Sequence, residues 1–162
     1  MRLLLHVTAA LGFLVSSLLA TAPATAQAAP SSWGRWIDVD VGAHTATAMQ
    51  GSTPVYTAPI AAGRPEFPTP LGTYYIQRRV LDETMDSSTI GIPRNSPGGY
   101  YLPHVMYTQY FNGGRALHGN YWAPDWVFGH ANTSHGCVGM RNRDAAFFWN
   151  FASIGTPVVI HN

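Results

Sequence analysis

Short runs of alternating apolar and polar residues, each closed by glycine, proline or asparagine, constrain the fold of this chain more than any other feature. Residues 36–41 alternate with the period of two that is typical of a half-buried strand. Similar runs predict strands at residues 45–49, 54–57, 72–80, 104–111, 115–118 and 156–160. A helical period is persuasive at residues 142–153, where Ala145, Phe148 and Trp149 share a face. The sequence therefore predicts a mainly β domain with one C-terminal helix.

Two segments show neither period and are predicted as loops. They are residues 82–100, which are rich in glycine, proline and serine, and residues 119–136. Long loops inside compact domains are often active-site lids, so we expect residues 82–100 to be mobile and to order over a substrate. At the start of the helix, Asn142 has a side chain suited to the N-cap.

The N-terminus reads as an export signal rather than as part of the fold. Met1 and Arg2 precede an apolar stretch at residues 3–20, and small residues follow it up to Ala26. We therefore expect a signal peptide at residues 1–26, a short linker at 27–33 and one domain at 34–162. An uncleaved membrane anchor is the alternative. Either way, the domain is expected outside the cytoplasm, in the cell wall or periplasm.

Composition excludes several classes of partner. The chain contains no lysine and has a formal net charge of +1, so we expect no nucleic-acid partner. No second apolar segment is long enough to span a bilayer, so we expect no membrane span in the mature chain. The mature chain, about 135 residues, has the size of one ordinary domain. We expect it to act as a monomer.

Cys137 is the only cysteine, and it follows His135 by two residues. In an exported protein an unpaired cysteine is either intermolecular or a reactive thiol. His118 lies sixteen residues before Ser134, within reach of the same turn in a folded domain. This pattern predicts an activated nucleophile, with a thiol pKa below the ordinary value. The alternative is an inert, buried thiol.

A cysteine nucleophile needs a general base and donors for the oxyanion that forms on attack. His118, at the end of a predicted strand, can be the base. Gly136 lets backbone N–H groups of the turn converge on one point. A zinc site built from His118, His135, Cys137 and His130 is an alternative. It is the less favoured one, because His135 and Cys137 are too close in sequence to chelate easily. We therefore expect neither a metal nor a cofactor.

These residues resemble a known family. His118-Gly119, a spacer and Ser134-His135-Gly136-Cys137 are similar to the signature of the L,D-transpeptidase catalytic domain, also called the YkuD domain. The resemblance continues in residues 68–74, 85–89, 95–100 and 155–158 and covers about residues 34–161. The lid segments are similar to those of the actinobacterial enzymes. The resemblance implies a YkuD-like β-sandwich or barrel with a long active-site lid, and a minimal catalytic domain without accessory wall-binding modules.

The same resemblance implies roles for individual residues. Cys137 would be the nucleophile, and His118 its base, oriented by the carbonyl of Gly119. The turn residues Ser134, His135 and Gly136 would brace the turn, line the site and shape the oxyanion hole. We assign the following residues to substrate binding: Tyr100, Met85, Trp122 and Asn142. The chain departs from the family at Gly139, where asparagine or arginine is usual, and Arg141 lies two residues further on.

The implied activity is peptidoglycan L,D-transpeptidation, with stem peptides as partners. Cys137 would form a thioester with a donor stem, and the amine of a second stem would complete a 3→3 cross-link. The family also typically forms stable adducts with carbapenems. If water or a protein amine accepts the acyl group, the chain is instead an L,D-carboxypeptidase or a protein-anchoring enzyme. A non-catalytic wall-binding module is the alternative from another class. A papain-like or NlpC-type peptidase would place its cysteine before the histidine, the reverse of the order here.

Overall fold

The computed structural model describes residues 34–162. The predicted signal peptide at 1–26 and the linker at 27–33 lie outside the described residues. Within the described range, no helix has the length and apolar character needed to cross a bilayer.

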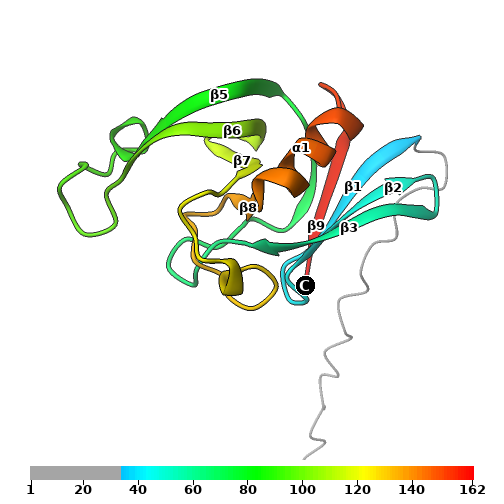
Figure 1. The fold of residues 1–162 in the computed structure, drawn as a ribbon, viewed down its shortest axis with the longest axis horizontal. Helices are drawn as coiled ribbons and strands as arrows, with labels where there is room; N and C mark the ends of the chain where they lie inside the picture. The colour runs from blue at the N-terminus through cyan, green and yellow to red at the C-terminus, as the bar shows by residue number, and fades with distance from the viewer. Residues whose placement is uncertain (1–33) are drawn as a thin grey trace, which may run out of the picture.

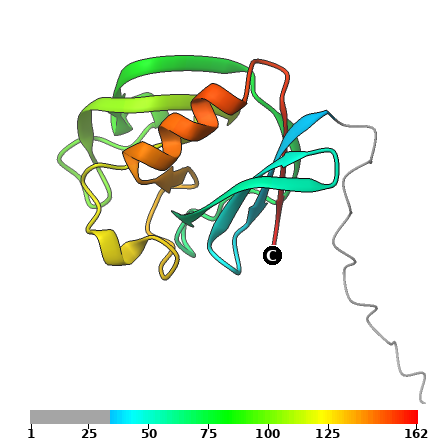
Figure 2. The ribbon, with the colours of Figure 1, turned by 45° about the vertical axis from the view of Figure 1, so that its right-hand side comes forward.

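Nine strands form one continuous sheet in the order β4-β9-β1-β2-β3-β8-β7-β6-β5. The strands are β1 (Arg35–Asp40), β2 (Thr45–Gln50), β3 (Thr53–Ala61), β4 (Gly72–Tyr75), β5 (Arg78–Asp86), β6 (Tyr101–Asn112), β7 (Arg115–Gly119), β8 (Val138–Met140) and β9 (Pro157–His161). The sheet curls into a half-barrel around the helix α1 (Asn142–Phe151), which lies between its two halves (Figures 1 and 2). The prediction of a mainly β domain with one C-terminal helix is confirmed.

β8 joins the two halves of the sheet. It pairs antiparallel with β3, through Ile60 and Met140, and parallel with β7, through Leu117 and Val138. All three residues of β8 are buried. β8 was not predicted from the sequence, because three residues are too few to show a period.

One apolar cluster holds the helix against both halves of the sheet. Phe148 of α1 is completely buried. It belongs to the same cluster as Ile37 of β1, Ile60 of β3 and Leu117 of β7. Burying a side chain of this size stabilises a fold by about 1.5–3 kcal/mol. The helix therefore fixes β7, which carries His118, and β8, which directly follows Cys137.

The predicted strand at 72–80 is wrong in one respect, because the structure divides it into β4 and β5. The division occurs where the chain leaves one partner strand for another. The N–H of Ile76 donates to Thr156 O at 2.9 Å, beside β9, whereas the N–H of Gln77 donates to Tyr110 O of β6 at 2.8 Å. Two different hydrogen-bonding partners thus meet inside one continuous β-type sequence.

The predicted loop at 82–100 is shorter than expected. β5 continues to Asp86, paired with β6 through Asp82 and Met106 and through Met85 and Leu102. A 3₁₀ turn, η1 (Ser87–Ile90), follows, and the irregular segment spans 91–100. β5 and β6 extend as a two-stranded arm at this end (Figure 1). No residue of β5 is fully buried, because the arm faces solvent. Its sequence therefore lacks the alternation that is typical of a half-buried strand.

The loop predicted at 119–136 begins one residue later, because Gly119 ends β7. The rest is confirmed apart from one 3₁₀ turn, η2 (Asp125–Val127), and an isolated β-bridge between Ser134 and Gly63. The expected N-cap is wrong. Arg141 occupies that position without a capping side-chain hydrogen bond, and Asn142 is the first residue of the helix.

Candidate active site

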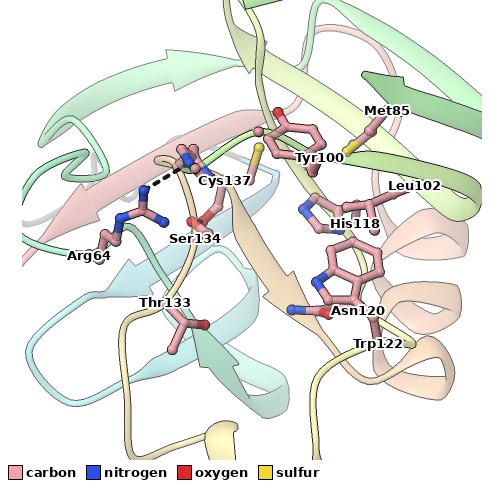
Figure 3. A pocket seen from close by; sticks show the side chains of 13 residues that line it. Arg64, Met85, Tyr100, Leu102, His118, Asn120, Trp122, Thr133, Ser134 and Cys137 are labelled. Atoms are coloured by element: carbon pink, nitrogen blue, oxygen red, sulfur yellow. Dashed lines mark hydrogen bonds between the residues drawn. The ribbon is translucent and has the colours of Figure 1, made fainter. Parts of the chain in front are cut away.

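A pocket of about 350 Å³ opens beside the ends of β7 and β8 (Figure 3). It is lined by Arg64, Met85, Gly98, Gly99, Tyr100, Leu102, His118, Asn120, Trp122, Thr133, Ser134, His135 and Cys137. Most of the site residues expected from the sequence are among them. Gly119, Gly136 and Asn142 are not.

Strand pairing brings the two central side chains together. His118 of β7 lies opposite Gly139 of β8 in a parallel register, and Cys137 comes directly before β8. Residues that are far apart in sequence thus reach one pocket from neighbouring strands. Figure 3 shows the Cys137 sulfur beside the Tyr100 ring and the His118 imidazole below that ring.

His118 is held in one tautomer. Its Nδ1 donates to the carbonyl oxygen of Gly119 at 3.0 Å, so Nε2 carries the free lone pair. The ring is only 3% exposed and stacks on Trp122 with a centroid separation of 5.6 Å. Burial lowers the pKa of His118, and the hydrogen bond to Gly119 opposes this in part. The imidazole is therefore neutral at pH 7, which is the form that can accept a proton.

Asn142 packs against Gly119 and does not line the pocket. A Cβ atom on residue 119 would lie 2.1 Å from Asn142 Oδ1, a distance that real side chains do not reach. A larger residue at 119 would therefore require the Asn142 side chain to move. The expected contact between Asn142 and a substrate has no support in this geometry.

The Cys137 thiol rests in its protonated form. Desolvation by surrounding protein raises its pKa, although the backbone N–H of Ala116 and the guanidinium of Arg115 act in the opposite direction. The thiol donates to Gly114 O, with a sulfur–oxygen distance of 3.8 Å, rather than to His118. The expectation of a depressed thiol pKa is thus wrong for this resting state. The thiol must rotate toward His118 before attack.

Ser134 ties the turn together. Its hydroxyl donates to Cys137 O at 2.6 Å and accepts from the N–H of Gly136 at 3.1 Å. Gly136 has φ = +102°, a backbone conformation that favours glycine. The Gly136 N–H is engaged here and is not free to donate to an oxyanion.

His135 forms a wall of the pocket. Arg64 Nη2 donates to His135 Nε2 at 2.9 Å, and the His135 ring lies against the rings of Phe67 and Tyr100, with centroids 4.8 Å and 5.3 Å away. Burial, with a smaller contribution from Arg64, lowers the pKa of His135. Its accepting nitrogen is already occupied, so His135 is less suited than His118 to be the base.

Residues 91–100, the candidate lid, are anchored to η1 at their C-terminal end. The N–H of Tyr100 donates to Ser87 Oγ at 2.9 Å, and the N–H of Ser87 donates to Tyr100 O at 3.0 Å. These bonds fix the base of the lid to η1. Met85, Tyr100 and Cys137 also line a second pocket of about 300 Å³. Cys137 is therefore shared by two pockets, and Met85 and Tyr100 also line both.

Arg64 and Asn120 also line the pocket and were not among the predicted site residues. Asn120 is 5% exposed, and its Oδ1 accepts from the N–H of Ala123 at 3.2 Å. Its position directly after His118-Gly119 was an available signal. Arg64 stands 54 positions before His118 in an unremarkable Gly-Arg-Pro sequence, and only the fold reveals its role.

The metal alternative has no support in the described part of the chain, where no three His, Cys, Asp or Glu side chains are placed to hold an ion. His130, the suggested additional ligand, directs Nδ1 to Phe128 O at 3.1 Å and does not line the pocket.

Comparison with known proteins gives consistent matches. The model of the YkuD family, the L,D-transpeptidase catalytic domain, matches residues 34–160. Probable L,D-transpeptidase 3 of Mycobacterium tuberculosis is 37% identical over 102 residues, which is 63% of this chain and 37% of that protein. Among solved structures, an L,D-transpeptidase from Mycobacterium smegmatis has a TM-score of 0.74 at 33% identity, covering 79% of this chain and 58% of that one. The LD transpeptidase LdtMt1 in complex with imipenem has a TM-score of 0.76 at 31% identity, covering 79% and 59%.

Proposed function

Because this chain belongs to the L,D-transpeptidase catalytic-domain family, we propose that it transfers acyl groups between peptidoglycan stem peptides through Cys137. The chain spans only 37% of the curated relative described above and about three fifths of the solved chains, 58% and 59%. The observation that carries the proposal is local: Cys137 and a neutral, tautomer-fixed His118 share one pocket.

The first half-reaction forms the thioester. His118 Nε2 takes the thiol proton while the sulfur attacks the carbonyl carbon of the third residue of a tetrapeptide stem. The N–H of Cys137 stabilises the oxyanion, a contribution of about 10²–10³ in rate. The C–N bond then breaks, and the His118 imidazolium gives its proton to the departing amine of the terminal D-residue.

The directions of the two pKa shifts decide how the proton moves. Burial raises the pKa of the thiol and lowers the pKa of His118, so both partners rest neutral. A preformed thiolate–imidazolium pair is therefore disfavoured before substrate arrives. Proton transfer accompanies attack, and His118 acts as a general base rather than as a permanent counter-ion.

The second half-reaction consumes the thioester. The side-chain amine of another stem's third residue attacks, His118 takes the amine proton, and the C–S bond breaks to release the thiol. The product is a 3→3 cross-link. Because Cys137 lines two pockets, donor and acceptor can occupy different ones. With water as acceptor the same chemistry trims the stem, and with a protein amine it anchors a protein.

This activity implies a cellular location and an oligomeric state for the protein. The enzyme acts outside the cytoplasm on the cell wall after removal of the signal peptide at residues 1–26. Residues 34–162 work as a monomeric catalytic domain.

The test uses disaccharide-tetrapeptides and mass spectrometry. Incubation with residues 27–162 should give a dimer that is lighter than two monomers by one terminal D-residue. Cys137→Ser should give none. Shortened monomer without dimer would assign the carboxypeptidase activity instead, and unchanged substrate would favour a non-catalytic wall-binding module.

A further inference from the structure

The charge of the pocket is carried by one side chain. Among its lining residues in the described part of the chain, Arg64 is the only one with a formal charge at neutral pH. The pocket contains no carboxylate, and the pKa of each lining histidine is lowered by burial. A ligand in this pocket therefore meets a net positive charge.

Arg64 is fixed in place by several contacts. Its backbone N–H donates to Ser134 O at 3.0 Å, which joins it to the Cys137 turn. Its guanidinium lies over the Phe67 ring at 4.8 Å and donates to His135 Nε2 at 2.9 Å. Figure 3 shows it across Cys137 from His118 and Trp122. A planar group that is already oriented loses little entropy when it binds a ligand.

Within residues 34–162, the one anion paired with Arg64 is weakly held. Glu66 Oε2 lies 3.5 Å from Arg64 Nε, and the Glu66 side chain is 69% exposed. Solvent screens such a pair, and Glu66 does not line the pocket. The remaining guanidinium donors are available to a ligand, because one N–H serves His135 and the exposed Glu66 neutralises the charge only in part.

We propose that Arg64 binds a carboxylate of the acyl-donor stem peptide and makes the pocket select a free acid over the corresponding amide. This inference rests on the function proposed above and adds the group that the donor must present. A guanidinium binds a carboxylate through two parallel, charge-assisted hydrogen bonds, whereas a carboxamide offers one weaker acceptor. The carboxylate has two sources: the C-terminus of the leaving residue, or the side chain of the third residue.

The experiment measures peptide binding without turnover. Cys137→Ser protein, with and without Arg64→Gln, is titrated with four tetrapeptides. They carry an acid or an amide at the C-terminus, and an acid or an amide on the side chain of the third residue. Binding is followed by calorimetry. Because no acyl transfer is required, failure of this selectivity is separate from failure of the transpeptidase activity.

The expected result is a preference of ~10-fold or more for the acid at one of the two positions, lost in Arg64→Gln. The position that shows the preference identifies the carboxylate. Arg64→Lys should retain part of the preference, because it keeps the charge but loses the fork. Arg35→Gln is the matched control. Arg35 lines neither pocket and donates to Phe151 O at 3.2 Å, so the acid preference should stay unchanged.

Two results would overturn the proposal. One is the absence of any acid preference in the Cys137→Ser protein. The other is an equal loss of acid and amide binding in Arg64→Gln, which would mean that Arg64 only supports His135.

Discussion

The side-chain amide of Asn120 occupies the space that a side chain on residue 139 would fill. A Cβ atom added to Gly139 would lie 2.8 Å from Asn120 Nδ2 and 3.1 Å from Asn120 Cβ. Asn120, which follows β7, and Gly139, in the middle of β8, thus share one small volume beside the pocket. The departure of Gly139 from the usual asparagine or arginine therefore has a physical counterpart in Asn120.

This relationship predicts coupling between the two positions. Gly139→Ala should lower stability by about 1–3 kcal/mol through overpacking. In the Asn120→Gly background the same change should cost much less, because the space is then empty. Urea denaturation of the four proteins of this cycle measures the coupling. Strictly additive effects would show that the two residues do not compete for space.

His118 should be required for acylation, and the fold should tolerate glutamine in its place. We expect His118→Gln to slow thioester formation by ~10²–10⁴-fold. His118 is only 3% exposed, so alanine would also leave a cavity, and glutamine is the cleaner substitution. His135→Gln is the comparison, with a smaller loss of rate. If His135→Gln is the more damaging change, the base is His135.

The Cys137 thiol of the free protein should react more slowly than the thiol of an activated catalytic cysteine. Because burial raises its pKa, iodoacetamide labelling of the free protein should have a midpoint at or above the ordinary value of about 8.5. Arg115→Gln should move the midpoint higher, since the Arg115 guanidinium lowers the pKa. Arg35→Gln should leave it unchanged. A midpoint near 7 would instead indicate a preformed ion pair with His118.

Stability should fall on acidification below the unfolded pKa of histidine. Burial lowers the pKa of His118, so the unfolded chain binds a proton more readily than the folded chain. Stability from this group is therefore complete above about pH 6.5 and decreases as the pH falls from there toward the folded pKa. Melting temperatures between pH 5 and pH 8 measure the effect. His118→Gln should reduce the slope, and an unchanged slope would assign it to other groups.

The presence of Cys137 and His118 in one pocket was predictable, because a short sequence motif contains both residue types at a characteristic spacing. The β-rich fold was predictable where strands have one buried face, as in β1. The end of β5 was not, because an arm facing solvent shows no alternation. Arg64 was also not predictable, since nothing near it in sequence marks it. Its role arises only where the backbone of residue 64 pairs with that of Ser134.

The lid should matter more for turnover than for folding. The Tyr100 ring lies against His135, with a centroid separation of 5.3 Å, whereas the backbone N–H and C=O of Tyr100 hold the base of the lid to Ser87. Tyr100→Ala should therefore reduce kcat/KM with little change in Tm, and Tyr100→Phe should retain most activity. Unchanged kinetics in Tyr100→Ala would reduce residues 91–100 to a connector.

The central claim is that Cys137 is the sole acyl-accepting nucleophile, and intact-protein mass spectrometry with a carbapenem tests it most directly. A similar L,D-transpeptidase has been solved in complex with imipenem. Reduced, folded protein incubated with imipenem should gain the mass of one drug molecule, and peptide mapping should place it on Cys137. Cys137→Ser should gain nothing. An unmodified wild-type protein, or an adduct that survives in Cys137→Ser, would contradict the account.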